Sequence, residues 1–173
     1  MYNKFIDFLD KHDLYDKDII KYFWKNSLIF DYSNEEDRDF IGCYYSFDKS
    51  GRLIKIRACV PYIYDDKTIL INIHEYIHFY LLYKKIGKEC IIGIDSEVLP
   101  ILYEKIYILE NSNEELLKYE EYLNKYITNN SDKKYILALK LQDKLIEFYN
   151  KGLTIERLNF SAKVLARKYR NKI

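Results

Sequence analysis

Residues 66–86, with the sequence DKTILINIHEYIHFYLLYKKI, are the stretch from which the fold can be worked out. A single long helix is predicted over this range. Asp65 or Asp66 can cap its N-terminus, and Gly87 can serve as the residue after its C-terminus. It is the best-defined helix of the chain, and the other predicted elements are placed relative to it.

The centre of this helix contains His74-Glu75-Tyr76-Ile77-His78, which has the pattern H-E-x-x-H. Two histidines four residues apart on a helix project from the same face, one turn apart. That spacing allows both imidazoles to reach one zinc ion at about 2.0–2.1 Å. Zinc lowers the pKa of a water at the metal, and Glu75 can accept the proton of that water. The alternative interpretation is a helix with two unrelated histidines.

A catalytic zinc site also needs a third protein ligand and an open position. The candidates are the acidic residues that follow the predicted helix: Glu89, Asp95, Glu97 and Glu104. Glu97 is favoured because eighteen residues separate it from His78, enough for the zinc helix to end and a second helix to begin. Glu104, seven residues later on the same face, could orient a ligand. The alternative for Glu97 is an ordinary first-turn glutamate that the helix dipole favours.

The segment before the zinc helix predicts a β-hairpin. Residues 53–60 alternate between two faces with a period of two, as a strand does. Residues 40–47 precede them across the turn segment 48–51, which ends in glycine. Pro61 closes the second strand.

Helices are predicted for most of the remaining chain, at residues 3–13, 16–27, 96–110, 113–128, 132–150 and 154–171. Asp16 is the expected N-cap of the second, and Asp95 or Ser96 that of the third. Pro100 falls in or just after the first turn of that third helix, where proline costs least. The predicted fold class is therefore α+β, mainly helical, with a small antiparallel hairpin or sheet beside the zinc helix. A length of 173 residues suits a single domain over 1–173.

The composition suits a folded protein inside the cell. Apolar residues make up 49% of the chain, and the net charge of +1 gives no overall attraction to nucleic acid or to an anionic membrane. The three cysteines, Cys43, Cys59 and Cys90, form no C-x-x-C pair, which favours reduced thiols in a cytosol. No run has the length of a membrane span, and the acidic residues of the first segment argue against a signal peptide.

The last stretch of the chain is strongly basic and carries Arg157, Lys163, Arg167, Lys168, Arg170 and Lys172. The simplest interpretation is a solvated helix face. A role in binding nucleic acid is the alternative that this charge leaves open.

HEYIH, followed by eighteen residues and a glutamate, resembles the zincin superfamily, in particular its Glu-ligand branch, the gluzincins. Aminopeptidase N-type enzymes share this pattern, and SEVLPILYE (96–104) resembles the Glu-bearing helix of oligoendopeptidase-type enzymes. A small chain with a hairpin before its zinc helix is also similar to compact metallopeptidases of phage and conjugative elements. The resemblance covers about residues 40–110.

This resemblance implies that His74, His78 and Glu97 bind zinc and that Glu75 is the general base. It also implies that the edge strand of the hairpin holds an extended peptide or protein substrate by β-augmentation. The donor that would stabilise the transition state is not assigned, although four tyrosines lie near the hairpin: Tyr44, Tyr45, Tyr62 and Tyr64.

The sequence thus predicts a cytoplasmic zinc metallopeptidase that acts on a peptide or protein, with no membrane or nucleic-acid partner. Two other hypotheses stay open. The chain could be a catalytically inactive, zinc-stabilised binding or regulatory module on a zincin scaffold, or a helical interaction protein without metal.

Overall fold

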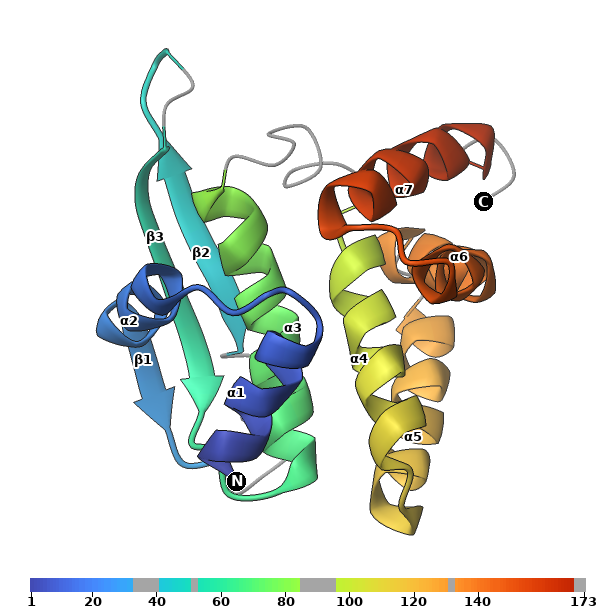
Figure 1. The fold of residues 1–173 in the computed structure, drawn as a ribbon, viewed down its shortest axis with the longest axis horizontal. Coiled ribbons are helices and arrows are strands. Elements are labelled where there is room, and N and C mark those ends of the chain that lie inside the picture. The colour runs from blue at the N-terminus through green and yellow to red at the C-terminus, as the bar shows by residue number, and fades with distance from the viewer. Residues whose placement is uncertain (33–40, 51–52, 85–95, 131–132, 170–173) are drawn as a thin grey trace. The chain divides into compact units, whose positions relative to one another are not determined.

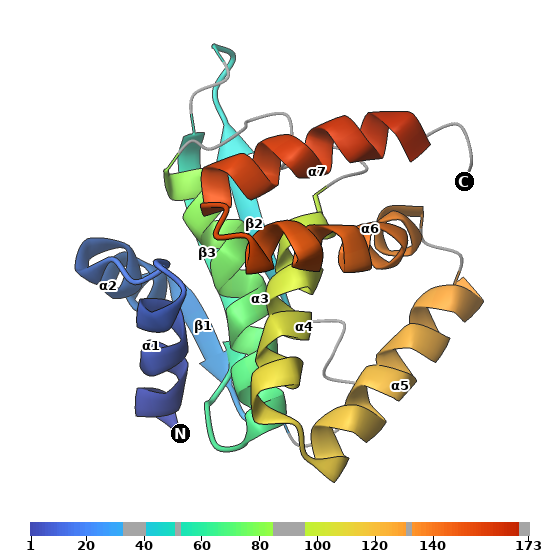
Figure 2. The same cartoon turned by 45° about the vertical axis from the view of Figure 1, so that its right-hand side comes forward.

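The computed structural model describes residues 1–32, 41–50, 53–84, 96–130 and 133–169. These residues form seven helices and a small three-stranded mixed sheet, so the fold is α+β and mainly helical, as predicted (Figures 1 and 2). The chain divides into two compact units, Met1–Lys85 and Ile86–Ile173. A single metallopeptidase-like domain over 1–173 stays a prediction, because it concerns the two units together.

The first unit contains the sheet and three helices. In chain order its elements are α1 (Tyr2–Lys11), α2 (Lys17–Lys25), β1 (Ser27–Phe30), β2 (Gly42–Phe47), β3 (Leu53–Pro61) and α3 (Asp66–Tyr83). The second unit is helical throughout its described residues, with α4 (Val98–Asn111), α5 (Glu114–Asn130), α6 (Lys133–Asn150) and α7 (Ile155–Tyr169).

The predicted hairpin forms the larger part of the sheet. Strands β2 and β3 pair antiparallel, with Gly42 opposite Cys59 and Cys43 opposite Ala58. An irregularity near the turn leaves Ile54 as an extra residue of β3, and its side chain is exposed. Gly51, the last residue of the predicted turn, lies outside the described residues.

Strand β1 was not predicted. It pairs in parallel with β3, from Ser27 opposite Ala58 to Phe30 opposite Pro61, so β3 is the central strand and the order is β1-β3-β2. Four residues are too few to show a period, and their partner lies about thirty positions away in the sequence. The tertiary pairing, rather than the local pattern, makes this segment a strand.

Helix α3 packs along β3 and forms the core of the first unit. Asp65 is its N-cap and forms a capping box with Thr68, since the Thr68 N–H donates to Asp65 Oδ1 at 2.7 Å and the Asp65 N–H donates to Thr68 Oγ1 at 3.1 Å. The helix ends at Tyr83, earlier than the predicted residue 86, with Lys84 as the C-cap. The predicted C-terminal Gly87 lies outside the described residues.

Helix α3 is fixed by polar contacts along its length. The Asn72 amide donates to the Pro61 carbonyl at 3.0 Å, which attaches the helix to the end of β3. The Tyr76 hydroxyl donates to the Leu14 carbonyl at 2.9 Å, between α1 and α2. Burial raises the pKa of Tyr76, so this hydroxyl stays a donor at neutral pH.

Helices α1 and α2 are shorter than predicted but occur in the predicted places. Asp16 caps α2 as expected, accepting from the N–H groups of Asp18 and Ile19 at 3.0 and 3.2 Å. The second carboxylate oxygen of Asp16 accepts from Lys84 Nζ at 2.8 Å, which ties the end of α3 to the start of α2. Lys4 of α1 pairs with Asp66 at the other end of α3.

In the second unit, α6 packs against α4 and α7, and α5 against α6. The buried residues of α5, α6 and α7 include Leu116, Leu123, Ala138, Leu141, Leu145, Leu158 and Ala162. Pro100 is the third residue of α4, within the first turn. Among the described residues, no helix is both long and apolar enough to cross a membrane.

Candidate metal centre

The two histidines of H-E-x-x-H lie on the same side of α3, one turn apart, as the sequence predicted. Their Nε2 atoms are 3.2 Å apart, and the rings are inclined at 64° with centroids 4.9 Å apart. Two imidazole nitrogens on one tetrahedral zinc, each at 2.0–2.1 Å, stand about 3.3 Å from each other. The separation of the two Nε2 atoms therefore matches that of two nitrogens on one zinc ion, and it is also the length of a hydrogen bond between the two rings.

The residues next to this pair along α3 are mostly buried. The neighbouring α3 residues Ile73, Tyr76 and Ile77 are completely buried, His74 is 8% exposed and His78 is partly exposed. A helix that is apolar on almost every side must be enclosed by the rest of the fold, so its few polar side chains are enclosed with it. Low exposure strengthens the interaction of these imidazoles with a cation, because water competes less.

Glu75 is about as buried as His74, with 6% of its surface exposed. Burial raises the pKa of the Cys43 thiol on β2 and of the Cys59 thiol on β3, and the nearby Glu75 carboxylate raises both further. The two thiols therefore stay neutral at neutral pH. Glu75 thus lies in a poorly hydrated environment beside the strands, which suits a carboxylate that accepts a proton.

Cys43 is a neighbour of Glu75 that the sequence reasoning missed. Cys43 stands opposite Ala58, which belongs to the buried face of β3 together with Ile56 and Val60. Residues directly opposite on antiparallel strands share a face of the sheet. The antiparallel pairing of the hairpin strands is the feature of the sequence that could have identified Cys43 as a neighbour of Glu75.

Glu97 belongs to the second unit, where it is the N-cap of α4 and is 9% exposed. Its side chain makes no capping hydrogen bond to the helix but accepts from the Ser96 hydroxyl at 3.2 Å. The prediction of Asp95 or Ser96 as the cap was wrong for Ser96, whose hydroxyl binds the Glu97 carboxylate instead. Asp95 and Glu89 lie outside the described residues.

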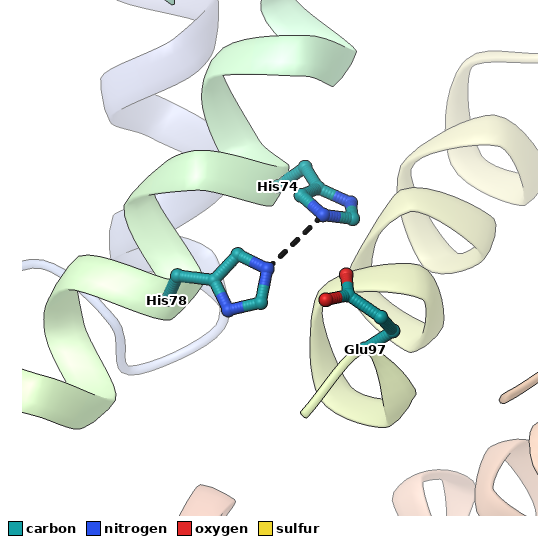
Figure 3. Close-up of side chains that lie close together, drawn as sticks. All are labelled: His74, His78 and Glu97. Carbon is teal, nitrogen blue, oxygen red and sulfur yellow. Dashed lines mark hydrogen bonds between the residues drawn. The ribbon is translucent and has the colours of Figure 1, made fainter. Parts of the chain in front are cut away.

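Figure 3 draws the side chains of His74 and His78 from the first unit and of Glu97 from the second, and all three are residue types that bind metal ions. Both histidines lie within the first unit, so their geometry does not depend on the second unit. Glu97 comes from the other unit, so its part in the ligand set belongs to the proposal below.

The other predicted site residues have no established role. Glu104 lines a small cavity of the second unit with Lys105 of α4 and with residues of α5 and α6. Its role in orienting a metal ligand stays a prediction. The Tyr64 hydroxyl donates to the Tyr32 carbonyl, while Tyr44 and Tyr62 are exposed, and the transition-state donor remains unassigned.

Comparison with known proteins adds no family to this description: no protein-family model, no curated protein and no solved structure matches the chain. Any assignment of function therefore starts from the residues themselves.

Proposed function

We propose that this protein is a zinc-dependent metallopeptidase in which His74, His78 and Glu97 hold the metal and Glu75 is the general base. The observation that carries the proposal is the 3.2 Å separation of the two histidine Nε2 atoms on α3. Two nitrogens and one carboxylate oxygen are a donor set that suits zinc and leaves a fourth coordination position open. The same three residues are the ones to which the gluzincin resemblance points.

Zinc supplies a Lewis acid that polarises the scissile carbonyl and makes water more acidic. Glu75 follows His74 directly and lies in a buried environment, and it is not itself one of the three proposed ligands. It accepts the proton of the attacking water and then donates it to the leaving amine. A scaffold that only bound zinc would need no carboxylate at this position, and this favours an enzyme over a binding module.

The substrate class follows from the sheet. Strand β2 is an edge of the described sheet. Its residue Cys43 lies near Glu75. An extended peptide can pair with such an edge by main-chain hydrogen bonds. We therefore propose a peptide or protein substrate, and a cytoplasmic location that fits the unpaired thiols of Cys43 and Cys59.

The replacement of Glu75 by glutamine tests the proposal. This change keeps the shape of the side chain and removes its basicity, so we expect bound zinc to be unchanged. Hydrolysis of labelled casein and of a quenched random peptide library should fall by about 100-fold or more. The matched control is Glu115→Gln at an exposed position of α5, which should hydrolyse the same probes at the rate of the unaltered protein.

Unchanged turnover in Glu75→Gln would refute the assignment of the base. An unaltered protein that binds zinc but hydrolyses neither probe would favour the inactive binding module instead. The zinc content and the hydrolysis rate thus separate the two hypotheses.

A further inference from the structure

Helix α7 has an outward face that carries apolar side chains. Its buried side consists of Ile155, Leu158, Asn159, Ala162 and Ala166. Phe160 and Val164 lie on the opposite side of the helix and are 68% and 50% exposed. Neither side chain is needed for the packing of α7 within its unit.

Positive charges flank these two residues on both sides. With 100° per residue, Arg157 and Lys168 lie on one side of the Phe160–Val164 ridge, and Arg167 and Lys163 lie on the other. Glu156 is the single acidic residue in the sequence of α7. We call the set Arg157, Phe160, Lys163, Val164, Arg167 and Lys168 the outer face of α7.

The four cations of the outer face make no ion pair with any described residue. Some surface lysines of α5 and α6 do form ion pairs. Lys118 and Lys125 of α5 pair with the glutamates one turn before them, and Lys144 of α6 pairs with Glu147. Among the described residues, the four cations of the outer face therefore lack the ion pairs that Lys118, Lys125 and Lys144 make.

We infer that the outer face of α7 is a docking surface for an acidic, amphipathic protein segment, with apolar residues at its centre and carboxylates around them. The carboxylates would meet the uncompensated cations, which gives charge complementarity. An apolar centre with a charged rim is also the usual anatomy of a protein–protein interface, in which arginine and aromatic residues are enriched. This inference is independent of the metal centre.

Other anionic partners fit this face less well. A surface that binds nucleic acid needs its cations where the phosphates run, and such a surface gains little from the exposed Phe160 and Val164 at the centre. A helix that lies in a membrane surface needs a broad apolar face, whereas the outer face offers only two apolar side chains.

Binding of a designed probe tests the inference. The probe is a labelled helical peptide with leucines at positions i and i+4 and glutamates on both sides of them. Fluorescence anisotropy with the full chain should show binding that weakens as salt is raised. A peptide with glutamine in place of every glutamate, a short duplex DNA and phosphatidylserine vesicles serve as competing ligands, and each should bind more weakly than the acidic peptide.

Two variants of the outer face locate the binding site. The double variant Arg167→Glu with Lys168→Glu should weaken binding by about tenfold or more, and Phe160→Ser by about fivefold. The matched control, Lys118→Glu with Lys125→Glu on α5, changes the net charge by the same amount and should bind as the unaltered protein does. Circular dichroism checks that each variant is folded.

Four results would overturn the inference. These are equal weakening by the α5 and α7 double variants, full binding by Phe160→Ser, tighter binding of DNA or vesicles than of the acidic peptide, and no binding of the peptide at all.

Discussion

Helices α3 and α7 depart in opposite ways from the usual rule that polar side chains are exposed and apolar side chains are buried. Helix α3 buries His74 and Glu75, which water would solvate, whereas α7 exposes Phe160 and Val164, which packing would stabilise. A buried polar residue and an exposed apolar patch are both more informative than a single exposed apolar residue. We relate the first pair of residues to the proposed chemistry of the first unit and the second pair to the proposed recognition surface of the second unit.

The two helices also differ in how their charges are balanced. The ends of α3 are neutralised within the first unit, since Asp66 pairs with Lys4 and Lys84 with Asp16. The cations of α7 have no such partners among the described residues. Charges of α3 thus serve the fold, while those of α7 stay accessible to another molecule.

The strongest test of this contrast is to replace one phenylalanine in each helix by alanine. Phe79 of α3 is fully buried, and its ring lies 5.2 Å from that of Phe23 and 5.7 Å from that of Tyr22. Phe79→Ala should lower the free energy of unfolding by about 3–5 kcal/mol, through lost burial and the cavity left behind. Phe160→Ala should change it by less than about 0.5 kcal/mol.

Urea denaturation of both variants measures these differences. A loss of stability in Phe160→Ala comparable to that in Phe79→Ala would contradict the view that the outer face of α7 does not stabilise the fold.

A smaller effect concerns the ion pair at the end of α3. The hydrogen bond from Lys84, with help from the Ile19 N–H, holds the pKa of Asp16 below its ordinary value of 3.8. A carboxyl whose pKa is lower in the folded than in the unfolded protein stabilises the fold above the ordinary pKa. That stabilisation is lost as the pH falls through the folded pKa.

The substitution Asp16→Asn isolates this charge, because asparagine caps a helix about as well as aspartate. Since the pair is partly exposed, we expect a loss of less than about 1 kcal/mol at neutral pH. Below pH 4 the stability of the variant should depend less steeply on pH than that of the unaltered protein. Thermal unfolding from neutral to acidic pH measures this, with Asp143→Asn at an exposed position of α6 as the control. Identical pH profiles for Asp16→Asn and the unaltered protein would show that this ion pair does not contribute to the pH dependence of stability.

Local patterns in the sequence predicted a large part of the fold. The period of two at residues 53–60 identified β3 and its hairpin, and Asp16 identified the start of α2. Strand β1 escaped prediction because its parallel partner is distant in the sequence and its four residues carry no period. The end of α3 was placed too late, since Lys84 already forms the C-cap.

How much of the candidate site could be predicted from the sequence depended on how far apart its residues lie along the chain. The spacing of His74 and His78 sets their geometry directly, because one helix carries both. The proximity of Glu75 to Cys43 depends on strand register and on how the sheet packs against α3, and no single segment encodes it. The participation of Glu97 depends on two units at once and stays a prediction.

The most direct test of the central claim is the zinc content of the purified protein, measured by mass spectrometry after purification without added metal and dialysis against equimolar zinc. The unaltered protein should hold about one zinc ion per chain, as should the control His12→Gln, which changes the histidine outside the pair. His78→Ala should hold close to none. Zinc at background level in the unaltered protein, or an equal zinc content in His78→Ala, would contradict the claim that this histidine pair is a metal centre.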